Sequence, residues 1–253
     1  VVNVFVANTH TPLLFFSSKG LCYKLKTYKL PEATAAGKGR PLVNLLPLEK
    51  DETITAILPV SEDDVKRVQE SGVEHFLMFA TASGTVRRNR MQDFDSIRAN
   101  GKIAMKLDDG DSLISVLPCT EDQDVFLTTY RGRCIRFPVS EIRVFAGRNS
   151  TGVRGLTVAD GDKIIGMAML NHGESDATVR SAYIKQSRAA RRAATGIEED
   201  AGDDDTEATD LVLTPEQMDK MALSEEFILT ISERQAMIRW IYSRRSLTVK
   251  KAG

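Results

Sequence analysis

The sequence predicts an all-β protein in which a unit of four strands recurs about every 50 residues. Short apolar runs alternate with turns that contain glycine, as in a series of hairpins. Gly132 follows Gly84 by 48 residues, and two later glycines repeat after 51 residues, Gly101 as Gly152 and Gly110 as Gly161. A repeat of this length is typical of radial or stacked β architectures rather than of a single sandwich.

The clearest unit lies between His75 and Cys119. Its first hairpin is predicted from an apolar run at 76–80, a turn ending at Gly84 and a basic strand that follows the turn. Its second hairpin is predicted from two short apolar runs, 103–107 and 113–117, that flank an acidic turn. Four strands in two hairpins therefore make up one unit.

The same order of signals occurs before and after this unit. In the first copy, hairpins are predicted at 13–28, around Gly20, and at 42–60; in the third, they fall at 125–137 and 156–169. We therefore expect residues 1–170 to form three units, at about 4–60, 75–119 and 124–170.

Residues 171–226 interrupt the repeat and are interpreted as an insertion in a loop. The run 198–207 is dense in carboxylates and poor in apolar residues, which favours disorder. The Arg- and Ala-rich run 187–194 is helical or disordered, and Thr214 before Pro215 predicts the start of a short helix at 215–223. Residues 227–253 are expected to hold a partial fourth unit with a divergent end, because 227–233 resembles a first strand but Gln235 stands where a turn glycine is expected.

The net charge of −1 conceals a segregation of charge along the chain. Residues 1–170 hold 22 Lys and Arg against 20 Asp and Glu, residues 171–226 hold 6 against 14, and residues 227–253 hold 6 against 1. The three cysteines lie far apart and are expected to be buried reduced thiols, as in a cytosolic protein. No apolar run is long enough for a membrane helix, no signal peptide precedes Val1, and the chain is expected to be an excised piece of a longer protein.

Enzymatic patterns are not found in the sequence. It has no phosphate-binding glycine loop followed by Lys and Ser, no nucleophile elbow, and no histidine with the spacing of a metal ligand. The acidic triplets near Gly110 and Gly161 are interpreted as solvated hairpin turns, because both lie at the same tip of their units. We therefore assign no catalytic residue and no metal site, and Tyr130, in a predicted hairpin turn, receives no catalytic role.

Basic residues recur at corresponding places in the units and are the candidate site. One set follows the first turn of each unit, and another precedes the second hairpin. The predicted contacts to a nucleic-acid backbone are Lys38, Arg40, Arg87, Arg88, Arg90, Lys102, Lys106, Arg131, Arg133, Arg136, Arg148 and Arg154. A belt of such charges suits the evenly spaced phosphates of a duplex, and backbone contact would dominate over base readout. The alternative is that these charges only decorate exposed strand faces.

Several long runs resemble the C-terminal domain of bacterial DNA gyrase A. They are LPEATAAGKGRPLVNLLPLEKDETITAILPV (30–60), GTVRRNRMQDF (84–94), NGKIAMKLDDGDSLISV (100–116) and GRNSTGVRGLTVADGDKII (147–165). The resemblance implies a β-pinwheel, a propeller-like ring of four-stranded blades with exchanged hairpins, of which this chain would hold an incomplete set. The family's Gln-Arg-Arg-Gly-Gly-Lys-Gly box is not in this chain, and we expect the blade that carries it to precede Val1.

The resemblance also implies a function and partners. The domain would bind and wrap double-stranded DNA and so support ATP-dependent negative supercoiling by a heterotetramer of gyrase A and gyrase B. Strand cleavage would belong to the N-terminal domain of gyrase A, and ATP and magnesium would act elsewhere in the holoenzyme, in the bacterial cytoplasm on the chromosome. Two alternatives remain: the corresponding domain of topoisomerase IV, and a β-propeller scaffold that binds proteins. We further expect the acidic 198–207 run to weaken DNA binding by competing for the basic rim.

Overall fold

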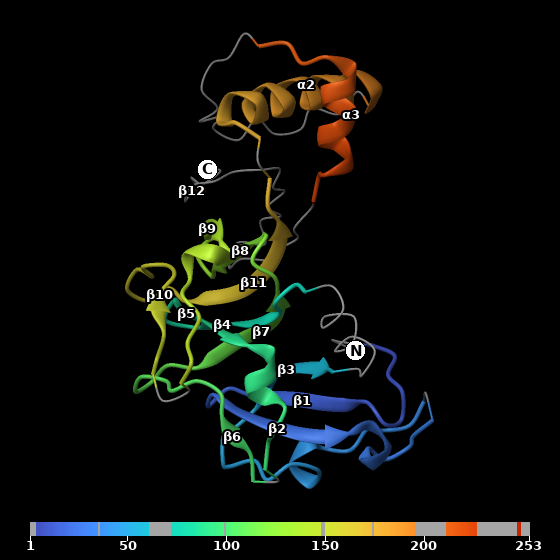
Figure 1. Cartoon of the computed structure of the whole chain (residues 1–253), viewed down its shortest axis with the longest axis vertical. Helices are drawn as coiled ribbons and strands as arrows, with labels where there is room; N and C mark the ends of the chain where they lie inside the picture. The colour runs from blue at the N-terminus through green and yellow to red at the C-terminus, as the bar shows by residue number, and fades with distance from the viewer. Residues whose placement is uncertain are drawn as a thin grey trace.

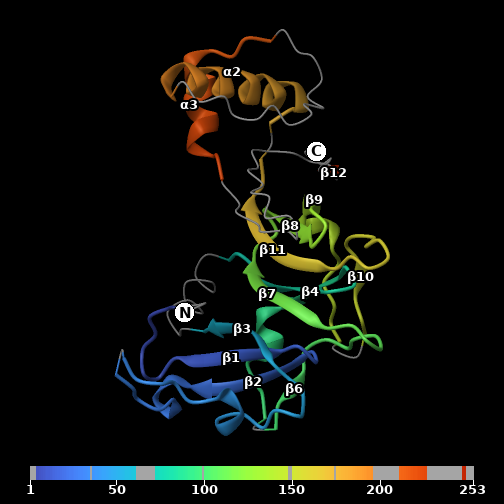
Figure 2. The same cartoon turned by 180° about the vertical axis from the view of Figure 1, so that it is seen from behind.

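The computed structural model describes residues 4–34, 36–60, 72–98, 100–147, 150–173, 175–195, 211–226 and 247–248. Three four-stranded antiparallel sheets follow one another along the long axis of the molecule, and two helices lie beyond the third sheet (Figures 1 and 2). The strands are β1 (Pro12–Ser17), β2 (Leu21–Lys26), β3 (Ile54–Pro59), β4 (Phe76–Thr81), β5 (Thr85–Arg90), β6 (Lys102–Ile103), β7 (Leu113–Cys119), β8 (Gln123–Thr129), β9 (Arg133–Pro138), β10 (Val153–Arg154), β11 (Ile164–Asn171) and β12 (Leu247–Thr248). The helices are α2 (Ala177–Thr195) and α3 (Pro215–Leu223), with 3-10 turns η1 (Thr27–Lys29), η2 (Leu42–Asn44), η3 (Met91–Phe94) and η4 (Val139–Glu141).

Each sheet, called a blade from here on, is built around one of the predicted first hairpins. The hairpins β1–β2, β4–β5 and β8–β9 turn through Gly20, Gly84 and Gly132, whose φ angles are +75°, +94° and +83°. Glycine adopts this left-handed region without steric cost, which explains why it recurs at the turn. A third strand, β3, β7 or β11, pairs with the other side of the first strand of the hairpin. The all-β fold class and the repeated hairpins are therefore confirmed.

The predicted second hairpin of each unit does not form within one sheet. Its first strand joins the preceding blade instead: β6 pairs with β2, and β10 pairs with β5, while β12 occupies the same place beside β9. The expected strand at 42–48 is also absent, since these residues form η2 and a loop that places Leu46 against blade 1. Strands exchanged between blades, as in a pinwheel, explain why the second hairpin was assigned to the wrong sheet.

The exchanged strands are anchored at the turn glycines. The carbonyl of Gly20 accepts hydrogen bonds from the N–H groups of Ala104 and Met105, at 2.8 and 3.2 Å. The carbonyl of Gly84 accepts in the same way from Gly155 and Leu156, at 2.9 and 3.2 Å. The turn glycine thus has a second role, because it is also the point where the next unit of the chain attaches.

Apolar side chains fill the spaces between the blades. One cluster, with Phe16, Phe79 and Phe94, joins blades 1 and 2, and another joins blades 2 and 3 around Phe76 and Leu127. The three aromatic rings of the first cluster meet at centroid distances of 5.6 to 5.8 Å. The blades therefore share their cores, and a change at one interface affects two sheets.

The three cysteines are free and buried, as the sequence predicts. Burial raises the pKa of the Cys119 thiol to about 12, with Arg88 acting weakly in the opposite direction. Burial also raises the pKa of Cys22. Both side chains are consequently protonated at neutral pH and belong to the cores.

The acidic turns are not only solvated, in contrast to the prediction. Asp111 accepts hydrogen bonds from the N–H and the hydroxyl of Ser83, at 3.0 and 2.6 Å. Asp162 accepts correspondingly from the N–H of Arg131, at 3.0 Å. Each of these carboxylates therefore fixes the tip of the first hairpin of its own unit.

Beyond blade 3 the chain forms a helical module, defined here as α2, α3 and the connecting residues 211–214. Helix α2 has 19 residues and includes the run 187–194, for which a helix was one of the two expectations, but it is longer than the single short helix expected in an otherwise disordered insertion. The short helix α3 begins as predicted, because Thr214 and Gln217 form a reciprocal cap at its start. In the described part of the chain, neither helix combines the length and hydrophobicity required to cross a membrane. The run 198–207 and residues 227–233 lie outside the described residues.

Candidate nucleic-acid interface

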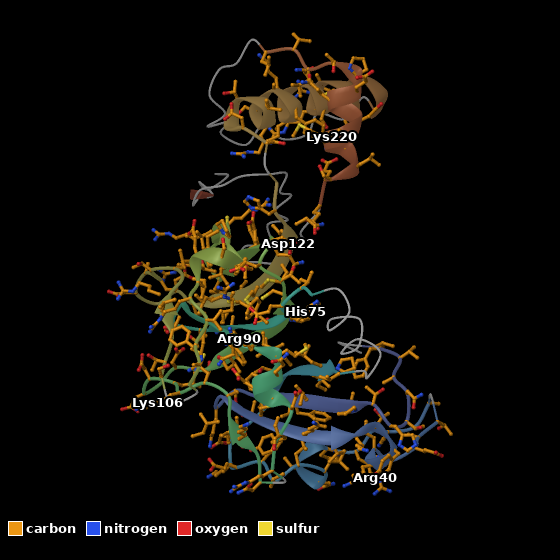
Figure 3. The ribbon with its side chains drawn as sticks, in the orientation of Figure 1. Arg40, His75, Arg90, Lys106, Asp122 and Lys220 are labelled. Carbon is orange, nitrogen blue, oxygen red and sulfur yellow. The ribbon has the colours of Figure 1, made fainter. Side chains whose placement is uncertain are left out.

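The structure divides the predicted basic residues into three groups by exposure. The exposed ones are Lys38, Arg40, Arg90, Lys106, Arg131, Arg133 and Arg154. Lys102 and Arg136 are half-buried, Arg87 and Arg88 are buried, and Arg148 lies outside the described residues. Figure 3 shows that Arg40, Arg90 and Lys106 lie far apart on blades 1 and 2, so the exposed residues are spread over the surface rather than gathered in a pocket.

Arg87 is an interior residue with an exposed fraction of 0%. Its Nε donates to the side chain of Asn89 at 2.6 Å, and its two terminal nitrogens donate to the carbonyls of Ser150 and Gly147. Its guanidinium also lies 4.9 Å from the ring centre of Phe145. Arg87 therefore holds Phe145, Gly147 and Ser150 of the third unit against blade 2, and the prediction that it contacts DNA from the surface does not fit its position.

Arg88 occupies a basic position that is repeated in every blade, four residues after the turn glycine. Its guanidinium stacks on Phe76 and donates to Glu121 at 3.1 Å, while its side chain is 5% exposed. At the same position in blade 1, Lys24 donates to the carbonyl of Asp95 at 2.7 Å. In blade 3, Arg136 binds Asp124 at 2.7 Å. Asp124 lies on β8, so this contact stays within the hairpin of blade 3, whereas Arg88 and Lys24 bind segments outside their hairpins. The most regular basic position is therefore engaged by the protein itself in all three blades.

Lys102 and Arg136 are directed to the protein in a similar way. The ammonium of Lys102 donates to the carbonyls of Asp93 and Ser96 at 3.0 and 2.9 Å. Arg136 adds a hydrogen bond to the carbonyl of Asn171 at 2.8 Å. Both side chains keep a positive charge near the surface, but their hydrogen-bonding groups bind the chain itself.

The exposed residues have looser surroundings. Arg90 forms an ion pair of 2.9 Å with Glu74, in which the two side chains are 48% and 61% exposed. Arg131 donates to the carbonyl of Asp160 at 3.1 Å. Exposed ion pairs of this kind contribute about 0–1 kcal/mol and exchange readily for other partners. These arginines can consequently turn toward an external anion at small cost.

Three further exposed basic residues lie near the candidates and were not among the predicted contacts. Lys26 stands six residues after Gly20, as Arg90 does after Gly84; the repeat places it in the recurring basic set, although it was not counted among the contacts. Arg143 lies 4.3 Å from the ring centre of Phe145, and Lys163 lies 5.6 Å from that of Tyr130. Neither has a counterpart in the other units that sequence reasoning could have used.

The arrangement of exposed basic side chains suits contact with a polyanion. Across the described ranges, no cluster of His, Cys, Asp and Glu has the geometry of a metal site. Basic side chains on the surfaces of several blades can each neutralise one phosphate of an extended backbone. Few aromatic side chains in the described part are exposed, and among them Tyr28 already packs edge-on against His10 at 5.8 Å, so a row of rings on which bases could stack is not seen there.

Comparisons with known proteins agree with this architecture. The family model described as "DNA gyrase C-terminal domain, beta-propeller" matches residues 11–61, 75–120 and 123–171, more than half of the chain. The DNA gyrase A protein of Granulibacter bethesdensis is 48% identical over 243 residues, which cover 92% of this chain and 25% of that protein. The DNA gyrase A protein of Escherichia coli K12 is 48% identical over 162 residues, which cover 64% and 18%. The chain therefore spans a quarter or less of these relatives.

Solved structures are similar in fold. The crystal structure of the C-terminal domain of DNA topoisomerase IV matches with a TM-score of 0.57 at 23% identity, over 66% of this chain and 49% of that one. The structure of a DNA gyrase A C-terminal domain matches with a TM-score of 0.50 at 24% identity, over 65% and 49%. At these identities the two structures support the blade architecture alone.

Proposed function

Because the chain belongs to the family of DNA gyrase C-terminal β-propeller domains, we propose that it binds double-stranded DNA and wraps it as part of a gyrase A protein. The observation that carries this proposal is the set of exposed basic side chains on all three blades. Lys38 and Arg40 lie in the loop before η2, and the others lie at strand ends, in a hairpin turn or in the exchanged segments, where an extended ligand can reach them. The proposed contacts are Lys38, Arg40, Arg90, Lys106, Arg131, Arg133 and Arg154, with Arg148 as an untested candidate.

The mechanism is backbone binding with bending. A duplex that follows the blades exchanges condensed counterions for lysine and arginine, so binding gains the entropy of ion release. The contacts position the duplex without reading bases, and the energy of bending is offset by contacts along a longer path. Arg87, Arg88 and Arg136 support DNA binding indirectly, because they hold the blades and loops that carry the exposed basic residues.

DNA supercoiling would require this domain to act together with the other domains and subunits of the enzyme. We propose that a wrapped duplex is presented to the N-terminal cleavage domain of gyrase A, in a heterotetramer with gyrase B. ATP hydrolysis and magnesium would act in those other parts, and negative supercoiling in the bacterial cytoplasm would be the result. No residue of this chain is proposed to be catalytic.

Neutralising exposed basic residues is expected to flatten the salt dependence of DNA binding. In the triple variant Lys106→Gln, Arg133→Gln and Arg154→Gln, three phosphate contacts are lost, and the slope of log affinity against log salt should become less steep by about 2.7. The measurement is fluorescence anisotropy with a labelled duplex at several salt concentrations. A double variant of exposed lysines outside the proposed path, Lys50→Gln with Lys220→Gln, is the control.

Two outcomes of this titration would count against the proposal. An unchanged slope in the triple variant would show that these residues do not meet phosphates. Absence of any salt-dependent affinity in the unmodified chain would instead favour a propeller scaffold that binds proteins.

The acidic run 198–207 is expected to lower DNA affinity. Its seven carboxylates belong to the same chain as the blades, so they are expected to compete with phosphates for the same lysines and arginines. Replacing them by Gln and Asn should therefore tighten binding at low salt, and the gain should shrink as the Debye length falls below about 10 Å near 0.1 M salt. Equal affinities of the two proteins at low salt would contradict the competition.

A further inference from the structure

The helical module has its own small core. Ala182 and Tyr183 of α2 pack with Leu213 and with Met221 of α3, and all four are at most 6% exposed. Val179 and Met218 extend this cluster on either side. Because α2 buries a defined face, its opposite face is also defined and is directed away from this core.

Hydrogen bonds connect the end of the helical module to blade 3. Asn171, at the end of β11, donates its backbone N–H and its side-chain amide to the two oxygens of Glu226, both at 2.9 Å. Its carbonyl accepts from Arg136 of blade 3. The two ends of the module are therefore joined to each other and to the blade.

Glu225, next to Glu226 in the chain, binds side chains of α2. Glu225 accepts two hydrogen bonds from Arg191, at 2.7 and 3.0 Å, and one from the hydroxyl of Tyr183, at 3.3 Å. The Glu225 side chain is only 9% exposed, so this ion pair is partly shielded from water. The orientation of α2 relative to blade 3 is consequently held by specific contacts rather than by a flexible tether.

α2 carries an unbalanced charge. The helix contains Arg180, Lys185, Arg188, Arg191 and Arg192, and it contains no Asp or Glu. Lys185, Arg188 and Arg192 follow one another by three and four residues, which places them on one helix face. That face lies to the side of and behind the core face formed by Val179, Ala182 and Tyr183; in it Lys185 and Arg192 are exposed and Arg188 is half-buried. We call these three residues the α2 basic face.

We propose that the α2 basic face is an additional DNA-backbone contact, which extends the path of the duplex beyond blade 3. This inference rests on the proposed function. Both views place the helical module at the end of the molecule opposite blade 1, so the duplex would pass the three blades and then reach the module (Figures 1 and 2). The surface is an extension of the proposed interface and not a second site for another ligand.

The dimensions of the α2 basic face suit a phosphate backbone. Seven residues separate Lys185 from Arg192, which corresponds to about 10 Å along a helix axis. One DNA strand carries a phosphate about every 3.4 Å of duplex axis, so about three phosphates fall within this length. Lysine and arginine on a helix surface reach such groups without burying the helix.

Relatives differ in how much of this part of the chain they match. The match to the Granulibacter protein leaves less than a tenth of this chain uncovered, so it includes most of residues 171–226. The match to the Escherichia coli protein covers 64% of the chain, which is less than residues 1–170 alone.

The test is the salt dependence of binding in the variant Lys185→Gln, Arg188→Gln and Arg192→Gln. Glutamine keeps a good helix propensity, and far-UV circular dichroism verifies that α2 remains folded. With a duplex long enough to cover the three blades and the module, the slope of log affinity against log salt should become less steep by about 2.7. With a duplex that covers only one or two blades, variant and parent should differ little.

Lys220→Gln is the matched control, because this exposed lysine belongs to the same module but lies on α3, outside the α2 basic face (Figure 3). If the triple variant loses helix content, Lys185→Gln alone should still reduce the slope by about 0.9. An unchanged slope with the long duplex would overturn the inference while leaving the proposed function intact. Tighter binding by the variant would also overturn it.

A chain that binds no duplex at any salt concentration would have a different meaning. In that case the proposed function itself fails, and the α2 basic face has no path of DNA to extend. The unmodified protein is therefore measured first.

Discussion

Replacing Arg87 by alanine is expected to destabilise the protein by about 3–5 kcal/mol, near the upper end of single-residue effects. The guanidinium is fully buried and donates to Asn89 and to the carbonyls of Gly147 and Ser150. Without it, buried polar groups lose their partner and a cavity opens beside Phe145. A domain of ordinary stability, about 5–15 kcal/mol, would lose a large part of its margin. Urea denaturation followed by circular dichroism measures the loss.

Arg90→Ala is the matched control, since it removes the same side chain from the same strand. Arg90 is exposed and its ion pair with Glu74 is solvated, so its loss should cost less than about 1 kcal/mol. The two variants should affect DNA binding for different reasons. Arg90→Ala should weaken binding although the protein stays folded, whereas Arg87→Ala should weaken it only because the structure is lost. Equal stabilities of the two variants would contradict the interior role of Arg87.

Arg87→Lys separates charge from geometry. Lysine keeps the positive charge, but an ammonium cannot direct donors to three partners in the plane of a guanidinium. We expect this variant to recover only part of the stability lost in Arg87→Ala. Full recovery would indicate that the charge over Phe145, and not the hydrogen bonds to Gly147 and Ser150, holds the third unit against blade 2.

The hairpins were predictable because their signals are local. A glycine with positive φ between two apolar runs predicts a turn wherever it occurs, and three such turns in the same order predict repeated sheets. The exchanged strands were not predictable in this way. Each has two residues, and β6 pairs with β2 about 80 positions earlier, a distance at which local patterns carry no information.

The candidate site was predicted less completely, because repetition of a charge does not distinguish an exposed position from a buried one. Strands inside a stack of blades are covered on both faces, so Arg87 and Arg88 are both enclosed although they point to opposite sides. The repeat contains a signal that Arg87 is buried. Tyr23 of blade 1 stands at the same position after its turn glycine, and a large aromatic residue there indicates an interior site.

Gly84→Ala is expected to have an effect of similar size, through the joint between two units. A Cβ at this position would lie 2.2 Å from the carbonyl oxygen of Leu156 and 3.0 Å from the side chain of Val158. The exchanged segment would therefore have to move away, and the two hydrogen bonds that the Gly84 carbonyl accepts would be lost. Adding the cost of a left-handed alanine, about 1–2 kcal/mol, to two lost hydrogen bonds gives about 3 kcal/mol or more.

Gly110→Ala isolates the contribution of the joint. Gly110 lies at the tip of an acidic turn with a similar φ of +81°, and apart from its chain neighbours no described residue lies within 4 Å of a Cβ placed there. This variant should therefore show the backbone cost of about 1–2 kcal/mol alone. The difference between the two variants, measured by urea denaturation, is the contribution of the exchanged segment.

Hydrogen exchange can locate the structural change in the Gly84→Ala variant. The amides of Gly155 and Leu156 should lose protection, while those within the β8–β9 hairpin keep theirs. DNA affinity should fall as well, because Arg154 lies on the displaced strand β10. Equal destabilisation by Gly84→Ala and Gly110→Ala, with unchanged protection at Leu156, would mean that the blades hold together without this joint. The turn glycine would then be required only for its backbone conformation.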